Sequence, residues 1–110
     1  MKIIKNKIIP FPGYKAINLF GLVFTKGDLS EIEQNHEAIH TAQMREMLYL
    51  PFYIWYGLEY AIKLPFNGFN NNRAYPAISF EQEAYLKQND LDYLKNRKHY
   101  AWWQYLTQYK

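Results

Sequence analysis

The sequence contains no cysteine. This excludes disulfide bonds, thiolate metal sites, iron–sulfur clusters and a cysteine nucleophile. The N-terminal segment also lacks the long apolar run of a signal peptide, because Lys5, Asn6 and Lys7 separate the isoleucine pairs at 3–4 and 8–9. We therefore expect an intracellular, cytoplasmic protein.

Acidic residues are missing from residues 1–27, which carry five lysines. All ten Asp and Glu residues lie within 28–92, and the charges of 93–110 are again basic. The net charge of +3 therefore arises from basic ends around an acidic middle, and not from a uniformly cationic surface. No recognised nucleic-acid-binding motif accompanies the basic ends, so we do not expect nucleic acid as the partner.

The composition is that of one folded domain over residues 1–110, since 49% of the residues are hydrophobic and 21% are charged. Weak alternation over 2–9, a turn over 10–14 and a β-rich run over 16–25 predict an N-terminal antiparallel β-ribbon. The rest of the chain has helical character. The expected fold class is therefore α+β, small and predominantly helical.

Helix boundaries are predicted from capping residues and proline. Ser30 and Glu33 form a capping box, which predicts a helix from there to about Leu50, where Pro51 ends or kinks it. A second capping pattern, at Ser79 and Gln82, predicts a helix to about residue 88. We further expect helices over 52–63 and near 91–108, and a loop over 64–76, which is rich in Asn, Gly and Pro.

The helix that follows Ser30 contains the segment His-Glu-Ala-Ile-His. His36 and His40 are four residues apart and therefore share one helix face. Two imidazoles and one further ligand form an open zinc site, with water in the fourth position. Glu37 lies beside that point and would take the proton of the zinc-bound water. This is the HExxH arrangement of zinc peptidases, and it predicts a zinc-dependent hydrolase.

The third ligand is expected to be a carboxylate distant in the sequence. The metzincin class is excluded, because the ten residues after His40 contain no further histidine. Glu81 shares a predicted helix face with Ala84, whose small side chain allows close helix approach. Glu83 lies about 200° away and can pair with Lys87 on a solvated face. We predict Glu81 as the ligand and keep Glu83 in reserve.

The HEAIH segment at 36–40 and the EQEA segment at 81–84 together resemble the HExxH…ExxA pattern of gluzincin-type zinc metallopeptidases. The short spacing and length are similar to those of the minimal gluzincin domains called minigluzincins. The resemblance covers about residues 16–88, and only the two motifs are specific. It implies one zincin-like domain in which His36, His40 and Glu81 hold zinc and Glu37 is the general base. It also implies that a strand near 17–25 pairs with an extended peptide or protein substrate.

The sequence departs from the family pattern after the alanine. Many gluzincins have Asp or Asn there, where this chain has Tyr85, whose hydroxyl either supports a ligand or simply packs. Gln43 is a second candidate for supporting a ligand. No motif marks a group that would stabilise an oxyanion. The candidates for this role are Tyr75, Arg73, Tyr85, His99 and Tyr100.

Two other functions stay open at this level. One is a metal-binding or interaction module without catalysis, because 110 residues leave little surface to shape a substrate pocket. The other is a basic and aromatic surface that binds nucleic acid or a membrane. Residues 47–62 contain one charge in sixteen and are too short to span a bilayer. Core packing, a homodimer interface and a membrane-surface contact are the alternatives for this segment.

Overall fold

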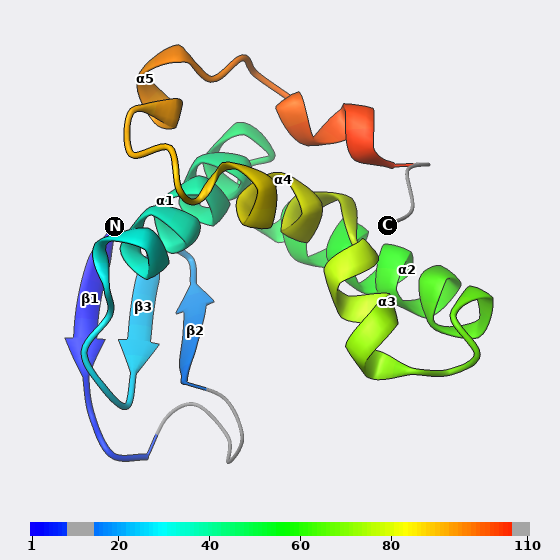
Figure 1. The fold of residues 1–110 in the computed structure, drawn as a ribbon, viewed down its shortest axis with the longest axis horizontal. Helices are drawn as coiled ribbons and strands as arrows, with labels where there is room; N and C mark the ends of the chain where they lie inside the picture. Colours follow the sequence, from blue (N-terminus) through cyan, green and yellow to red (C-terminus); the bar gives the residue numbers. More distant parts are fainter. Residues whose placement is uncertain (9–14, 107–110) are drawn as a thin grey trace.

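The computed structural model describes residues 1–8 and 15–106 (Figure 1). The chain begins with three strands and continues with helices, which confirms the α+β class. The strands are β1 (Lys2–Lys5), β2 (Ala16–Leu19) and β3 (Leu22–Thr25). The helices are α1 (Glu31–Glu46), α2 (Leu50–Phe66), α3 (Asn71–Ala77), α4 (Ser79–Lys87), α5 (Tyr93–Asn96) and the 3₁₀ helix η1 (Ala101–Tyr105).

The sheet has the strand order β1-β3-β2. β2 and β3 form the predicted antiparallel hairpin, and Phe20 and Gly21 at its tip both have positive φ, as a tight hairpin turn requires. β1 was expected to continue this antiparallel ribbon, but it pairs with β3 in parallel. The turn predicted over 10–14 lies outside the described residues. Because β3 lies between the other two strands, β2 is at an edge of the sheet.

Helix α1 begins as predicted and ends earlier than predicted. Both hydrogen bonds of the capping box between Ser30 and Glu33 are present. The helix stops at Glu46, and the chain turns through Leu48 and Tyr49, which both have positive φ. Pro51 then lies in the first turn of α2, where its missing N–H costs no helical hydrogen bond. The prediction that the first helix continues to about Leu50 was wrong, because the positive φ values of Leu48 and Tyr49 end it before Pro51 is reached.

The loop predicted over 64–76 contains helix on both sides of a short turn. α2 continues to Phe66, so Pro65 lies in its last turn. The Asn70 side chain accepts a hydrogen bond from the Asn72 N–H and caps α3. Asn, Gly and Pro therefore mark helix ends in this segment, and not an extended loop.

The second predicted capping box is absent, although α4 forms where it was expected. Ile78 is the N-cap residue and makes no side-chain cap hydrogen bond. Ser79 is buried in the first turn, where its hydroxyl donates to Glu59 of α2. Gln82 donates instead to the carbonyls of Ala77 and Tyr105.

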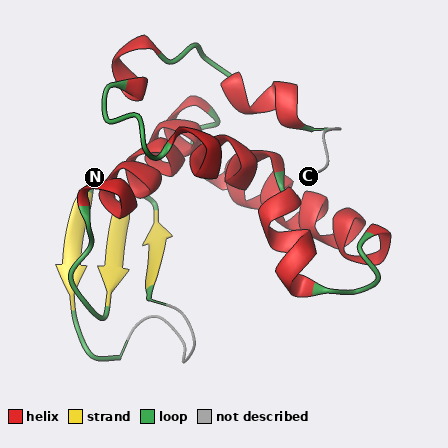
Figure 2. Cartoon of the chain, in the orientation of Figure 1, coloured by secondary structure: helices red, strands yellow, loops and turns green. Residues whose placement is uncertain are grey.

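The helix predicted near 91–108 is replaced by α5, an extended segment and η1. Arg97 is extended and turns its guanidinium inward, while Tyr100 has a left-handed conformation, so a continuous helix cannot pass through them. Figure 2 shows this C-terminal part crossing the side of the helices that lies away from the sheet. Residues 107–108 lie outside the described residues.

The hydrophobic core joins α1, α2 and α4 to η1. Its buried members are Met44, Phe52, Ile78, Phe80 and Trp102. The three aromatic rings among them pack in series, with 4.4 Å between the centroids of Phe52 and Phe80 and 4.6 Å between those of Phe80 and Trp102. The core thus holds α1 against α4. Among the helices that the structure describes, none combines the length and the apolar character needed to cross a membrane.

Candidate metal centre

His36, His40 and Glu81 meet at one point between α1 and α4. The distances are 3.1 Å between the two histidine Nε2 atoms, 3.0 Å from His40 Nε2 to Glu81 Oε1, and 3.3 Å from His36 Nε2 to the same oxygen. All three side chains are buried. The described residues thus contain the group of potential ligands that the two sequence motifs predict.

The hydrogen bonds behind the two imidazoles determine which ring nitrogen faces this point. Gln43 donates from its Nε2 to the Phe80 carbonyl and to Glu83, so its Oε1 accepts from His40 Nδ1 at 2.8 Å. Gln88 Oε1 lies 2.8 Å from His36 Nδ1 and, as an amide oxygen, accepts a hydrogen bond from it. In a neutral histidine with a protonated Nδ1, the Nε2 carries a lone pair. In this tautomer, both Nε2 atoms face Glu81 with a lone pair that a cation can share.

Three lone-pair-bearing atoms this close repel one another unless a cation lies between them. Zinc–nitrogen and zinc–oxygen distances of about 2.0 Å place tetrahedral ligands about 3.3 Å apart. The observed edges of 3.0 to 3.3 Å are close to that value. Two imidazoles and a carboxylate are also the donor set of an open zinc site. The residues present therefore fit a bound zinc ion.

The electrostatics of the three side chains also favour a cation at this point. Burial lowers the pKa of His40, but the charge of Glu81 and the hydrogen bond to it outweigh burial and raise that pKa to about 9. Burial raises the pKa of Glu81, yet His40 and His36 outweigh it and hold that pKa well below its usual range. The cluster thus favours a positive charge at the point where the three atoms meet.

The second oxygen of Glu81 is held from α2. The Tyr56 hydroxyl donates to Glu81 Oε2 at 2.7 Å, which leaves Oε1 to face the histidines. Burial and then the charge of Glu81 raise the pKa of Tyr56, so its hydroxyl keeps the proton that it donates. Glu81 is thereby oriented to offer a single oxygen to an ion.

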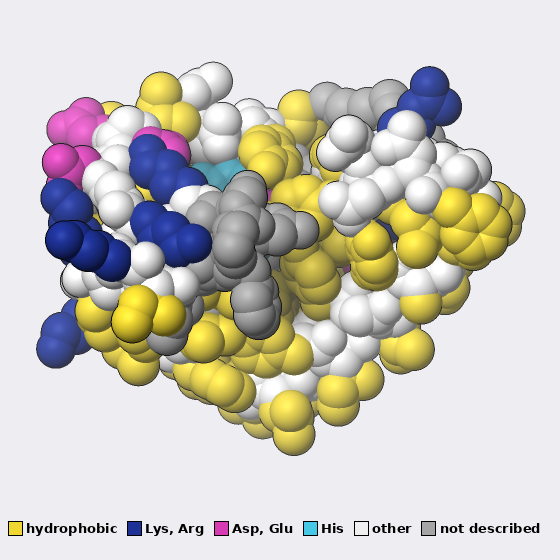
Figure 3. Space-filling view, turned by 90° about the horizontal axis from the view of Figure 1, so that it is seen from below, with side chains coloured by type: hydrophobic (Ala, Val, Ile, Leu, Met, Phe, Trp, Pro, Cys, Tyr) yellow, Lys and Arg dark blue, Asp and Glu magenta, His cyan; other side chains and the backbone are white. Residues whose placement is uncertain are grey.

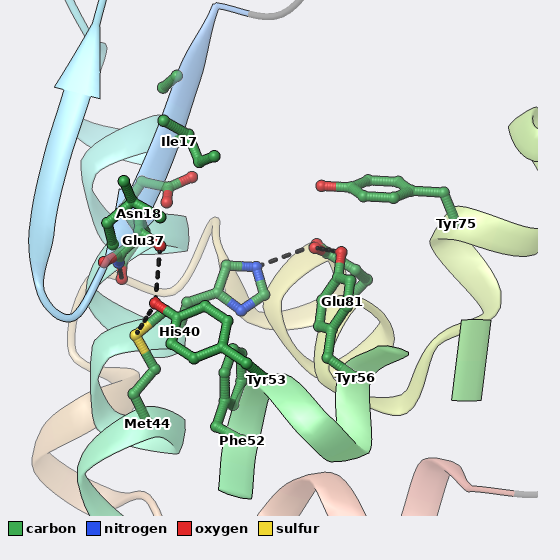
Figure 4. Close-up of a pocket in the computed structure, with 12 residues that line it drawn as sticks. Ile17, Asn18, Glu37, His40, Met44, Phe52, Tyr53, Tyr56, Tyr75 and Glu81 are labelled. Carbon is green, nitrogen blue, oxygen red and sulfur yellow. Dashed lines mark hydrogen bonds and ion pairs between the residues drawn. The ribbon is translucent and has the colours of Figure 1, made fainter. Parts of the chain in front are cut away.

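A cavity of about 440 Å³ opens beside the cluster (Figure 4). Its polar lining includes His40, Glu81 and Glu37, so the predicted general base lies in the same cavity as two of the three ligands. The Asn18 side chain of β2 donates to the Glu37 carbonyl and to Thr41, which connects β2 to α1. The rest of the lining is mainly apolar or aromatic: Ala16, Ile17, Leu19, Met44, Phe52, Tyr53, Tyr56 and Tyr75.

Glu83 does not lie on a solvated face, and the predicted pairing with Lys87 was wrong. Its side chain is fully buried and accepts hydrogen bonds from Arg97, Tyr93 and Gln43. Arg97 also forms two hydrogen bonds to Glu46 of α1. Glu83 lies outside the metal group and contacts His40 only through Gln43.

Tyr85 packs against a ligand. Its ring meets the edge of the His36 ring at 4.6 Å between centroids, and its side chain is half exposed. Gln43 is the supporting residue that the sequence offered as the other candidate. Of the residues considered for oxyanion stabilisation, Tyr75 lines the cavity, whereas His99 is 89% exposed beside Glu46. Arg73 and Tyr100 are not among the lining residues.

Sequence reasoning missed three residues that support the cluster. Gln88 lies seven residues after Glu81 and therefore on the same helix face. This seven-residue spacing is the feature of the sequence that could have indicated the contact of Gln88 with His36. Tyr56 and Arg97 come from other parts of the chain, and no motif links them to the ligands.

Comparison of the chain with family models, with curated proteins and with solved structures finds no match. A function for this chain is therefore argued from its own residues.

Proposed function

We propose that the chain is a zinc-dependent hydrolase that cleaves peptides, with His36, His40 and Glu81 as ligands and Glu37 as the general base. One observation carries the proposal: three buried side-chain atoms of the kind that bind metals converge on one point, and Glu37 lines the cavity beside it. The gluzincin resemblance of the two motifs supports the same assignment.

Zinc held at this point would supply a Lewis acid that polarises a carbonyl and lowers the pKa of water toward about 7. Glu37 would take the proton of the attacking water and return it to the leaving amine. Tyr75 would donate a hydrogen bond to the developing oxyanion, because its hydroxyl points into the cavity (Figure 4). Burial, and then the charge of Glu81, raise the pKa of Tyr75, so this hydroxyl stays protonated.

The cavity favours an extended peptide with an apolar side chain. Among the described residues, its lining contains carboxylates and aromatic rings and no lysine or arginine, so these carboxylates would repel an acidic side chain. β2 lies at the sheet edge and forms one wall, where a substrate strand could add by main-chain hydrogen bonds. Ala16 and Ile17 are the β2 residues of that wall that precede Asn18.

A metal-binding module without catalysis is the second candidate, and one observation favours it. The Tyr53 hydroxyl donates to the Asn18 carbonyl and accepts from the Phe20 N–H, so it already occupies main-chain groups at the end of β2. A substrate strand would have to pair before Asn18 or displace Tyr53.

Metal content and hydrolysis together test the proposal. We expect about one zinc per chain in the wild type, purified without a histidine tag, and none in His40→Ala. Cleavage of a quenched fluorescent peptide library should fall by at least about 100-fold in Glu37→Gln, with zinc retained. Glu31→Gln, exposed on the same helix, serves as the matched control. Zinc binding without cleavage by the wild type would favour the second candidate, and no zinc binding would contradict both.

A further inference from the structure

The outward side of α2 is apolar along its whole length. Its large side chains recur at every fourth position and are between 56% and 77% exposed: Leu50, Ile54, Leu58, Ile62 and Phe66. Residues four apart are neighbours on a helix surface, so these side chains form one continuous ridge. We call them the α2 ridge.

The charged residues of α2 lie on its inner side. Glu59 and Lys63 are buried and form an ion pair of 2.8 Å. Glu59 also accepts a hydrogen bond from the Ser79 N–H of α4. A surface helix of a monomeric protein normally has the reverse arrangement, with charges outside and apolar groups inside. The α2 ridge is therefore a surface that residues 1–8 and 15–106 leave exposed.

Beside the α2 ridge lies a row of small residues, and such rows form the grooves between the ridges of a helix surface. Gly57 and Ala61 are exposed next to Leu58 and Ile62, and a Cβ atom added at Gly57 would meet nothing within 4 Å. Ridges of residues four apart pack into such grooves on a second helix, at a crossing angle of about −50°. The ridge and the groove lie on the same face. Two copies of α2 related by a twofold axis can therefore each pack the ridge into the groove of the other.

The exposed apolar area is of the size that a stable dimer buries. Leu48, just before α2, and Phe69, just after it, are also exposed, with exposed fractions of 79% and 73%. Seven large side chains at about 100 Å² each give roughly 700 Å², near the ~800 Å² per partner of a stable interface. Figure 3 shows a broad apolar area on one face, with Lys and Arg gathered toward the sheet.

We propose that the α2 ridge is the interface of a homodimer in which α2 packs against α2 of a second copy. The cavity stays open in this dimer, because Phe52, Tyr53 and Tyr56 line it from the inner side of the helix. The proposal depends on the α2 surface alone and does not require zinc or catalysis.

Sedimentation equilibrium at micromolar concentration tests the dimer. The wild type should sediment as a dimer, and Leu58→Glu as a monomer with unchanged helix content. Leu91→Glu, which changes a leucine that is 52% exposed outside α2, should remain dimeric. A monomeric wild type, or a dimer that Leu58→Glu leaves intact, overturns the proposal.

Gly57→Leu separates a second copy from a lipid surface. The added side chain enters open space in the free chain, but it fills the groove that the partner ridge needs. We expect the dimer dissociation constant to rise at least about tenfold. Apolar contact with a bilayer would instead be strengthened by the extra leucine. Binding to phosphatidylcholine vesicles that increases in Gly57→Leu, with no change in dimerisation, would assign the α2 ridge to the membrane and overturn the dimer.

Discussion

At His40, an amide three residues further along the helix determines which ring nitrogen is available to a metal. Gln43 accepts from His40 Nδ1 and is itself held by Glu83. Gln43→Leu removes this acceptor and leaves the ring free to change tautomer and to rotate. We predict that zinc affinity falls by about 10- to 100-fold. Competition with a fluorescent zinc chelator measures the change.

The matched control is Gln34→Leu, which makes the same substitution at an exposed position of α1. Its zinc affinity should equal that of the wild type. Equal affinity in Gln43→Leu would mean that the hydrogen bond to His40 does not support the ligand.

Tyr75 provides a prediction for catalysis that is separate from metal binding. Tyr75→Phe removes the hydroxyl that points into the cavity and changes no ligand. If it donates to the oxyanion, kcat should fall by about 10- to 1000-fold, with KM and zinc content nearly unchanged. Tyr60→Phe is the control, because the Tyr60 hydroxyl donates to Asn71 away from the cavity. A loss of zinc in Tyr75→Phe would show that this residue supports the cluster.

The close approach of the three candidate ligands could be predicted at the residue scale because their positions follow from helix spacing. His36 and His40 needed only the four-residue repeat, and Glu81 was separated from Glu83 by the helix face it shares with Ala84. The environment of Glu83 could not be predicted, since its burial depends on Arg97, fourteen residues away. The contact of Tyr56 with Glu81 likewise depends on how α2 packs against α4.

At the scale of single elements, the start of α1 depends on Ser30. Its side chain accepts from the Glu33 N–H, and the Glu33 side chain accepts from the Ser30 N–H. Ser30→Ala should therefore lower the free energy of unfolding by about 1 kcal/mol. Ser30→Asn should restore most of this loss, since asparagine also caps helices. Urea denaturation measures both, and an equal loss in the two variants would contradict a capping role.

The junction between α1 and the segment after α5 is held by a buried ion pair. Arg97 forms hydrogen bonds to Glu46, and the Tyr100 N–H donates to the same carboxylate. Burial raises the pKa of Glu46, but the contacts with Arg97 and Tyr100 outweigh it and lower that pKa below 4.5. The carboxylate therefore stabilises the fold above about pH 4.5, and this contribution is lost as pH falls through the lowered pKa.

Glu46→Gln should consequently be less stable than the wild type by about 3 kcal/mol at pH 7. The difference should shrink as the pH falls below 4.5, because Glu46 is then protonated first in the unfolded chain, where its pKa is not lowered, and this favours unfolding of the wild type. Urea denaturation at several pH values measures it. A difference that stays constant down to pH 3 would mean that the charge of Glu46 is not what stabilises the junction.

Helix starts were easier to predict than helix ends. Ser30 carries its own signal, because a cap is made by residues close in sequence. The sequence contains no such signal for the end of α1 at Glu46. Leu48 and Tyr49 have side chains that disfavour positive φ, and they adopt it because of the position that α2 takes in the fold. Ser79 failed as a cap because Glu59, twenty residues earlier, binds its hydroxyl.

At the scale of the whole molecule, composition and the order of patterns predicted an α+β domain. The arrangement of its parts could not be predicted, since it depends on contacts between segments far apart in sequence. β1 pairs with β3 in parallel across the hairpin, and Trp102 closes the core from the C-terminal side. The group of candidate ligands joins α1 to α4 in the same way, with forty residues between His40 and Glu81.

Zinc should therefore stabilise the entire fold, because its ligands come from two helices that the unfolded chain keeps apart. At a free zinc concentration of 100 times the dissociation constant, the gain is about 2.7 kcal/mol, or roughly 10 °C in Tm for a domain of this size. Differential scanning calorimetry with zinc and with a chelator measures the shift. His40→Ala should melt at the same temperature in both conditions. A wild type that zinc does not stabilise would mean that the cluster binds a proton in place of a metal ion.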